Sequence, residues 1–116
     1  MTILDIKKLL NAEVLCCEEF VEKEVHTACG SDMMSDVLAF VKDQSVLITG
    51  LCNPQVVRTA EMMDMICICF VRGKIPDDSV IELAKERGIV LLATEYRMFA
   101  ACGILYESGL HGGASN

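Results

Sequence analysis

Residues 45–54 read SVLITGLCNP and join the pattern of a buried strand to that of a helix start. The apolar run up to Thr49 does not alternate with polar residues, which is typical of a strand covered on both faces. Gly50 closes the run, Asn53 is a favoured N-cap residue, and Pro54 suits the first position of a helix. The stretch therefore predicts one strand–loop–helix unit of a parallel sheet.

Similar units precede and follow this stretch. We expect further strands at about 25–29, 65–71 and 89–93, and helices at about 32–42, 54–63, 76–88 and 95–108, with Ser31 and Thr94 as N-caps. Because the links are short, the helices must cross over the sheet with right-handed connections. The sequence predicts a three-layer α/β fold, with a mostly parallel five-stranded sheet and helices on both faces.

The first 24 residues differ from this repeating pattern. Thr2 can cap a short helix that ends near Leu10, with Asp5 completing a capping-box-like pattern. A strand at 12–16 lies too close to its successor for a helical crossover, so we expect it to pair antiparallel or to lie at an edge. We interpret residues 1–110 as a single domain and residues 111–116 as a flexible tail.

Charge and composition exclude several classes of function. The 116 residues hold 10 Lys and Arg against 17 Asp and Glu, for a net charge of -7, and 53% are hydrophobic. The basic residues are scattered singly, which argues against a nucleic-acid partner. No apolar stretch is long enough for a membrane span, and the amino terminus lacks a secretory pattern. We therefore expect a cytoplasmic protein that binds neither nucleic acid nor membrane.

The seven cysteines are an odd number and lack a Cys-x-x-Cys spacing. We expect neither a disulfide framework nor a metal site, and no cofactor. Cys52 lies in the turn before a helix, where a thiol can become reactive, although a plain turn residue is the favoured interpretation. A cysteine-based redox or metal protein of anaerobic metabolism stays open as an alternative.

The loops that follow the parallel strands form the candidate site, because ligands of such sheets bind beyond the carboxyl ends of the strands. The candidate ligand-binding residues offer hydrogen bonds, positive charge or close backbone approach: Ser31, Thr49, Gly50, Asn53, Arg72, Gly73, Lys74, Thr94 and Arg97. We expect a phosphate or carboxylate to contact backbone N–H groups near Gly50 and Gly73, with Arg72 nearby. The alternative is that these residues only cap helices or carry solvated charges.

Known catalytic motifs are not found in the sequence. It has no Gly-x-Ser-x-Gly elbow, no Walker-type loop and no Gly-x-Gly-x-x-Gly after a strand. His26 falls within a predicted strand, where a structural role is favoured over that of a general base. We therefore expect no catalytic residues.

The last predicted helix carries more apolar surface than one sheet-facing stripe requires. We predict a homodimer whose interface includes Phe99, Gly103, Ile104 and Tyr106. The alternative is a helix that is simply buried on the sheet.

Several stretches resemble the DRTGG domain family: VLITG at 46–50, residues 66–76, the run from Ile81 to Thr94, and YRMF at 96–99. The resemblance covers roughly residues 5–110. The Asp-Arg of the family signature would fall within residues 51–53 and its Thr-Gly-Gly within 71–73, where one glycine is retained. Such domains accompany CBS domains in some pyrophosphatases, occur in phosphotransacetylases and are similar to the amino-terminal domain of HPr kinase.

The resemblance implies a regulatory or interaction module, often dimeric. We expect a non-catalytic regulatory or protein-interaction domain that senses a nucleotide or other phosphorylated metabolite at the carboxyl end of the sheet. Its expected partners are a second copy of the chain and a regulatory protein. The alternative is a small phosphoryl- or acyl-transfer enzyme, which would need a base near Thr49 or Cys52.

Overall fold

The computed structural model describes residues 1–40 and 42–112. Helices and strands alternate through most of the chain. In order they are α1 (Ile3–Leu9), β1 (Glu13–Cys16), the 3-10 helix η1 (Glu18–Phe20), β2 (Thr27–Gly30), α2 (Met34–Leu38), β3 (Ser45–Thr49), α3 (Pro54–Met62), β4 (Cys67–Phe70), α4 (Asp78–Arg87), β5 (Val90–Ala93) and α5 (Met98–Glu107).

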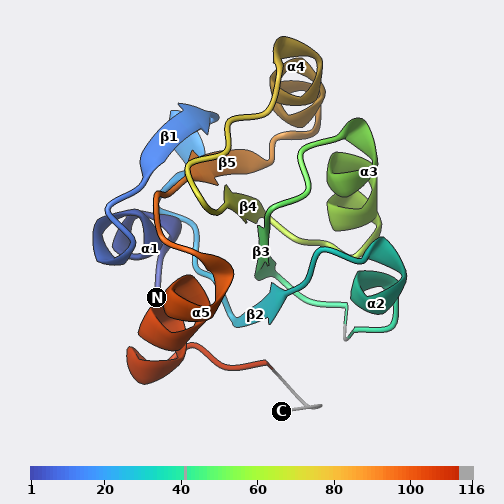
Figure 1. The fold of residues 1–116 in the computed structure, drawn as a ribbon. Coiled ribbons are helices and arrows are strands. Elements are labelled where there is room, and N and C mark those ends of the chain that lie inside the picture. The colour runs from blue at the N-terminus through green and yellow to red at the C-terminus, as the bar shows by residue number, and fades with distance from the viewer. Residues whose placement is uncertain (41, 113–116) are drawn as a thin grey trace.

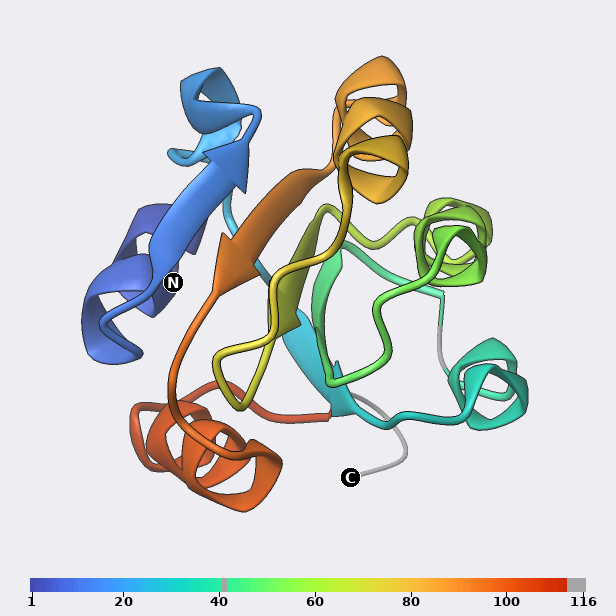
Figure 2. The same ribbon diagram turned by 45° about the horizontal axis from the view of Figure 1, so that its top comes forward.

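The five strands form one sheet in the order β1-β5-β4-β3-β2 (Figure 1). β2, β3, β4 and β5 are parallel, and β1 pairs antiparallel with β5 at the edge. Helices α1 and α5 cover one face, and α2, α3 and α4 cover the other (Figure 2). The predicted three-layer, mostly parallel fold is confirmed, as are the edge position and antiparallel pairing of the first strand.

The core lies along the three central strands. Every residue of β3, β4 and β5 is buried, as expected for strands that helices cover on both faces. Leu47, Phe70 and Leu91 are among the largest fully buried side chains, and such burial contributes about 1.5–3 kcal/mol per side chain. This rigid centre fixes the positions of the loops that follow each strand.

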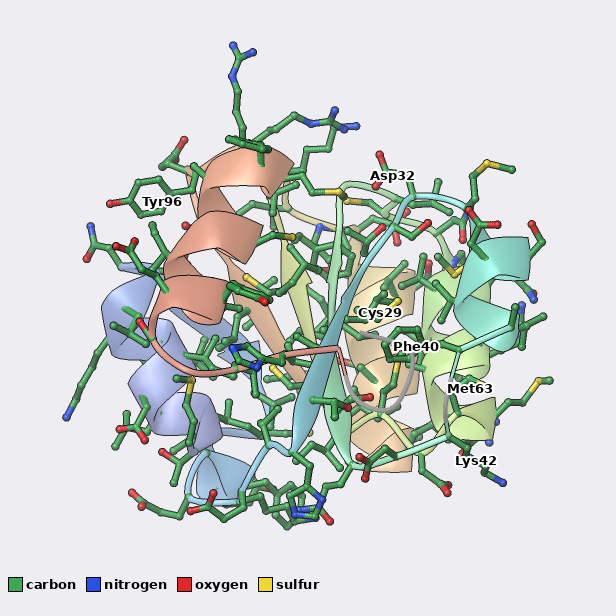
Figure 3. The ribbon with its side chains drawn as sticks, turned by 90° about the horizontal axis from the view of Figure 1, so that it is seen from below. Cys29, Asp32, Phe40, Lys42, Met63 and Tyr96 are labelled. Atoms are coloured by element: carbon green, nitrogen blue, oxygen red, sulfur yellow. The ribbon has the colours of Figure 1, made fainter. Side chains whose placement is uncertain are left out.

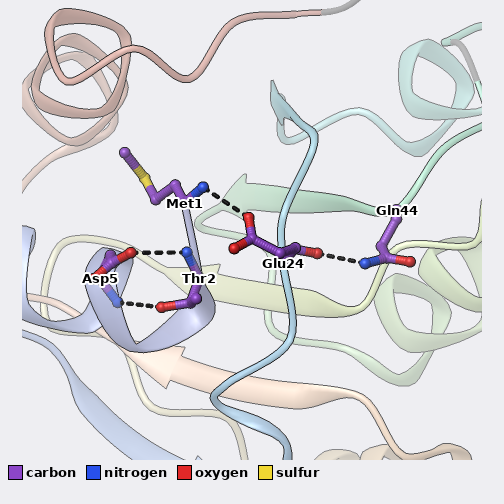
Figure 4. Close-up of polar contacts among 5 residues, drawn as sticks. All are labelled: Met1, Thr2, Asp5, Glu24 and Gln44. Carbon is purple, nitrogen blue, oxygen red and sulfur yellow. Dashed lines mark hydrogen bonds and ion pairs between the residues drawn. The ribbon is translucent and has the colours of Figure 1, made fainter.

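Polar contacts join the amino terminus to the segments that precede β2 and β3 (Figure 4). The backbone N–H of Asp5 donates to Thr2 Oγ1 at 3.1 Å, and Thr2 N–H donates to the Asp5 carboxylate at 2.9 Å, which confirms the capping box. The amino group of Met1 lies 2.9 Å from Glu24 Oε2, and the Gln44 amide donates to the Glu24 carbonyl. Glu24 thus links the start of α1 to the segment before β3.

Two predicted N-caps are wrong. The Ser31 hydroxyl accepts from Met33 N–H at 3.0 Å in a tight turn, and α2 begins later, with Met33 as its N-cap residue. Thr94 also does not cap: its hydroxyl donates to the Leu10 carbonyl at 2.6 Å, and α5 begins only at Met98. In both places the loop before the helix is longer than predicted, because the hydroxyl bonds elsewhere: that of Ser31 within its own turn and that of Thr94 to Leu10.

His26 was expected within a strand, but β2 begins one residue later, and the His26 ring lies 3.2 Å from Asp43 Oδ1. At the other terminus, the His111 carbonyl accepts from Ala28 N–H at 2.9 Å. The His111 ring stacks on Tyr106 with ring centres 4.3 Å apart. The rest of the predicted tail, residues 113–116, lies outside the described residues. Within the described residues, no helix is long and apolar enough to span a bilayer.

Candidate functional site

The loops that follow β2, β3, β4 and β5 lie side by side at the carboxyl edge of the sheet, because these strands are parallel neighbours. Arg72 N–H donates to the Tyr96 carbonyl at 2.8 Å, and Gly73 N–H donates to the Thr94 carbonyl at 2.9 Å. Figure 3 shows Asp32 and Tyr96 toward this end of the molecule and Lys42 toward the other. The structure therefore brings the predicted loops together.

An acidic side chain closes the end of β3. Asp32 Oδ1 accepts from the Gly50 N–H at 2.7 Å and from the Thr49 hydroxyl at 3.0 Å. The Thr49 hydroxyl also accepts from Leu51 N–H at 3.1 Å. Thr49 is fully buried and Asp32 is exposed. A carboxylate from the loop after β2 thus accepts the hydrogen bond of the main-chain N–H group at the end of β3.

A left-handed bend follows β4. Arg72 has φ 63° and Gly73 has φ 70°, a conformation that costs roughly 1–2 kcal/mol for a residue with a side chain. The Arg72 guanidinium lies so close to Gly50 that a Cβ on that glycine would collide with it. A Cβ on Gly73 would lie 2.6 Å from Glu95 Oε2. Both glycines therefore leave room for side chains of the protein itself, Arg72 at Gly50 and Glu95 at Gly73; close approach of a ligand to their backbone stays a prediction.

Three cations at this edge form no ion pair with the described residues. Arg72, Lys74 and Arg97 are exposed, and within the described chain none of them lies within 4.0 Å of a carboxylate oxygen. Arg87, by contrast, lies 2.8 Å from Glu61 Oε1 at the other edge. The carboxyl edge thus keeps unpaired positive charge on a chain of net charge -7.

Other predicted site residues use their polar side chains in hydrogen bonds within the protein. Thr94 is 2% exposed and bonds to Leu10, and the Asn53 side chain accepts from Val56 N–H as a helix cap. The Ser31 hydroxyl bonds within its own turn. The N–H groups of Gly50 and Gly73, expected to face an anion, both donate to protein oxygens. The groups left free for a ligand are chiefly the side chains of the three cations.

Cys52 is not set up as a reactive thiol. Burial raises its pKa above 9.0, although Lys74 and Arg72 act in the opposite direction and Asp32 adds to the rise. Its thiol donates to the Gly50 carbonyl at 3.7 Å. In the part of the chain that the structure describes, no three His, Cys, Asp or Glu side chains gather as a metal site would require.

Asp32 and Glu95 are the two residues of this edge that the sequence analysis missed. A hollow of about 180 Å³ next to Glu95 is also lined by Glu13, Asn11 and Gly73. The Gly-Ser-Asp order at 30–32 is a typical turn pattern, but sequence spacing cannot tell that the carboxylate reaches the neighbouring strand.

The amino edge of the sheet holds a hollow of about 590 Å³ that the sequence also did not reveal. Most of its charged groups form pairs: Lys42 Nζ lies 3.8 Å from Asp64 Oδ2, and the Arg87–Glu61 and His26–Asp43 contacts line it as well. Lys23 is the exception among the described lining residues, and its Nζ lies 4.5 Å from the centre of the Phe20 ring. This hollow therefore has less free positive charge for a ligand than the carboxyl edge.

One stripe of α5 faces away from the sheet. Phe99 is 93% exposed and Tyr106 is 56% exposed. Gly103 lies between them, and a Cβ there would have no neighbour within 4 Å among the described residues. Ile104 is half-buried, while Ala101 and Leu105 pack in the core. The helix therefore has both a sheet-facing side and an exposed apolar side.

Comparisons with known proteins agree with this architecture. The model of the DRTGG domain matches residues 5–108, and no curated protein matches the chain. A crystal structure of the CBS and DRTGG domains of the regulatory region of Clostridium perfringens pyrophosphatase, complexed with the activator diadenosine tetraphosphate, is similar with a TM-score of 0.72 and 21% identity. The similarity covers 92% of this chain and 46% of that one, so this chain spans less than half of its solved relative.

Proposed function

We propose that this chain, which belongs to the DRTGG domain family, is a non-catalytic regulatory domain that binds an anionic metabolite at the carboxyl edge of its sheet. The favoured ligands are a nucleotide or another phosphorylated metabolite. The observation that carries the proposal is the group of cations at this edge that form no ion pair within residues 1–40 and 42–112: Arg72, Lys74 and Arg97.

The physical reason is electrostatic. Arginine and lysine side chains form charge-assisted hydrogen bonds with phosphate oxygens, and these bonds are stronger than those between neutral groups. Arg72 is held in place by the bend at Gly73 and by contact with Gly50. The hollow beside Gly73, about 180 Å³, is smaller than the roughly 300–1,000 Å³ of a typical ligand pocket. Because Glu13 and Glu95 line that hollow, the phosphate groups of the proposed ligand would lie outside it, at the cations of the open edge.

The comparison with the pyrophosphatase is consistent with regulation by a nucleotide. That protein is described as a regulatory region in complex with an activating dinucleotide. For the present chain, the proposed ligand class rests on the positive charges of Arg72, Lys74 and Arg97 at the carboxyl edge.

A catalytic role is less well supported by the groups at this edge. The Asp32 carboxylate accepts hydrogen bonds from the Gly50 N–H and the Thr49 hydroxyl, so its Oδ1 is engaged by protein donors and not by a substrate. The raised pKa of Cys52 disfavours the thiolate that a nucleophile requires. We therefore propose ligand binding without turnover.

We also propose that the chain forms a homodimer through the stripe of α5 made by Phe99, Gly103 and Tyr106. These residues are spaced by four and three positions and lie on one side of the helix. Exposed aromatic side chains that cluster in this way are typical of interaction surfaces. A second copy of the chain is the proposed occupant, because closed two-fold dimers are the commonest assemblies. A regulatory protein partner is the alternative occupant.

A thermal-shift screen tests the proposed ligand. ATP, ADP, diadenosine tetraphosphate and inorganic phosphate are each added to the purified chain. A ligand at one hundred times its Kd stabilises the fold by about 2.7 kcal/mol, which raises the Tm of a domain this size by on the order of 10 °C. Arg72→Ala should weaken binding. The control is Arg58→Ala, because Arg58 is also exposed but lies on α3.

Two results would contradict the proposal. One is the absence of any Tm shift with every compound. The other is a shift that survives Arg72→Ala undiminished or falls equally with Arg58→Ala. Turnover of a phosphorylated compound by the pure chain would contradict the non-catalytic part of the proposal.

A further inference from the structure

The Asp32 carboxylate occupies the position that an anion would take at the end of β3. Asp32 lies in the loop after β2, yet one of its oxygens accepts from both the Gly50 N–H at 2.7 Å and the Thr49 hydroxyl at 3.0 Å. Both donors belong to buried residues of the neighbouring strand end. An acidic side chain is thus bound by main-chain and hydroxyl donors, as a phosphate oxygen would be.

Two cations, Arg72 and Lys74, lie near this contact. The Arg72 guanidinium packs against Gly50, and the charges of Lys74, Arg72 and Asp32 all act on the Cys52 thiol. In the described residues, neither cation comes within 4.0 Å of the Asp32 carboxylate. Asp32 therefore takes the hydrogen-bond donors and leaves the nearby cations without a partner.

We propose that Asp32 is an internal occupant of the anion site and sets the threshold for ligand binding. This inference rests on the proposed function, because it assumes that the ligand binds at this edge. A phosphate oxygen and the carboxylate require the same two donors, and two negative charges in one place repel. The incoming phosphate must therefore displace Asp32, and its apparent affinity falls by the fraction of molecules in which the donors are free.

The displacement needs little rearrangement. Asp32 is exposed, and the two bonds to Thr49 and Gly50 are its side-chain hydrogen bonds in the described structure. The adjacent turn is held by the Ser31 hydroxyl, and α2 begins only at Met34, with no side-chain cap bond. The loop can release Asp32 without unfolding a buried element.

The test compares three variants with the wild-type chain. Asp32→Ala removes the occupant, and Asp32→Asn removes its charge but keeps an oxygen that can accept both bonds. Asp36→Ala is the matched control. Asp36 is an exposed residue of α2, and its substitution removes the same charge from the chain. Inorganic phosphate and ATP are titrated by calorimetry, and the backbone N–H signal of Gly50 is followed by NMR in the same series.

We expect Asp32→Ala to tighten phosphate binding by at least about tenfold, because the phosphate no longer competes with a carboxylate for the two charge-assisted hydrogen bonds. Asp32→Asn should give a smaller gain in phosphate affinity. Asp36→Ala should change that affinity by less than about twofold, because the charge of an exposed side chain is screened by salt. The Gly50 signal should move with phosphate. An equal gain in Asp32→Ala and Asp36→Ala would overturn the inference.

The remaining outcomes separate this inference from the proposed function. If phosphate binding weakens in Arg72→Ala but does not strengthen in Asp32→Ala, the proposed displacement of Asp32 is wrong and the proposed function stands. No binding to any variant, Asp32→Ala included, would overturn both.

Discussion

The guanidinium of Arg72 lies against the backbone of Gly50, where a methyl group would collide with it. This contact joins the loop after β4 to the end of β3. It depends on the left-handed φ of 63° at Arg72. The position of this cation therefore depends on a glycine that directly follows another strand.

We predict that Gly50→Ala displaces Arg72 without unfolding the chain, since the colliding group is the far end of a flexible side chain. The melting temperature should change little, whereas binding of phosphate or nucleotide should weaken as much as in Arg72→Ala. Thermal unfolding and calorimetric titration of both variants check this. Full ligand affinity in Gly50→Ala would show that the contact does not position the cation for binding.

Sequence patterns predicted the strands and the order of the layers because burial on both faces leaves continuous apolar runs, as in Ser45–Thr49. They were less reliable at loops, where hydroxyl side chains have several possible partners. Thr94 was expected to cap a helix, but it bonds to Leu10, 84 positions away in the chain. Such a contact leaves no local signal.

The candidate site was likewise predictable from the sequence only in part. The convergence of the loops follows from parallel topology, and the cations Arg72 and Lys74 could be named from the sequence. The occupation of the Gly50 N–H by Asp32 could not, because it depends on the reach of one side chain between adjacent strands.

The exposed stripe of α5 gives a prediction about assembly. Phe99→Glu should convert a dimer to a folded monomer, because it places a charge on the most exposed apolar side chain of the proposed interface. The control is Met62→Glu, since Met62 is 57% exposed on α3, which covers the opposite face of the sheet. Light scattering with circular dichroism measures mass and folding together. A monomeric wild-type chain at micromolar concentration, or dissociation by both variants, would contradict the interface.

A buried hydroxyl predicts a stabilising substitution. Thr59 is fully buried in α3, and its hydroxyl has no hydrogen-bond partner in the described structure. Thr59→Val should raise the free energy of unfolding by about 1 kcal/mol, because the cost of burying an unpaired polar group is removed. Thr49→Val is the contrasting variant and should lower it by about 1 kcal/mol, since it removes bonds to Asp32 and Leu51. Denaturant titrations that give the same sign for both would contradict the argument.

The chain should lose stability in acid. Hydrogen bonds lower the pKa of Asp77 (from Ser79 and Val80), of Asp43 (from Gln44 and His26) and of Asp5 (from Thr2) below 3.8. A carboxylate whose pKa is lower in the folded state stabilises the fold above its unfolded pKa, and this contribution is lost as pH falls through the folded pKa. The Tm should therefore fall below about pH 4.

Asp77→Asn separates charge from capping in this acid response. Asparagine caps a helix as well as aspartate does, so the Tm at pH 7 should change little, while the fall below about pH 4 should become shallower. Calorimetric scans from neutral to acid pH measure both. An unchanged acid profile would show that Asp77 contributes nothing to the response.

Alkylation of Cys52 reports on the charges at the carboxyl edge. Burial raises its pKa, Lys74 and Arg72 lower it, and Asp32 raises it. Because the thiolate is the reacting form, iodoacetamide at mildly alkaline pH should modify Cys52 faster in Asp32→Ala than in the wild-type chain, and more slowly in Arg72→Ala. Cys102 is the internal control, since it is the other cysteine that is not fully buried and its pKa is raised by burial alone. Mass spectrometry of the two peptides gives both rates in one sample. Faster modification of Cys52 in Arg72→Ala, with an unchanged rate at Cys102, would show that Arg72 does not act on this thiol through its charge.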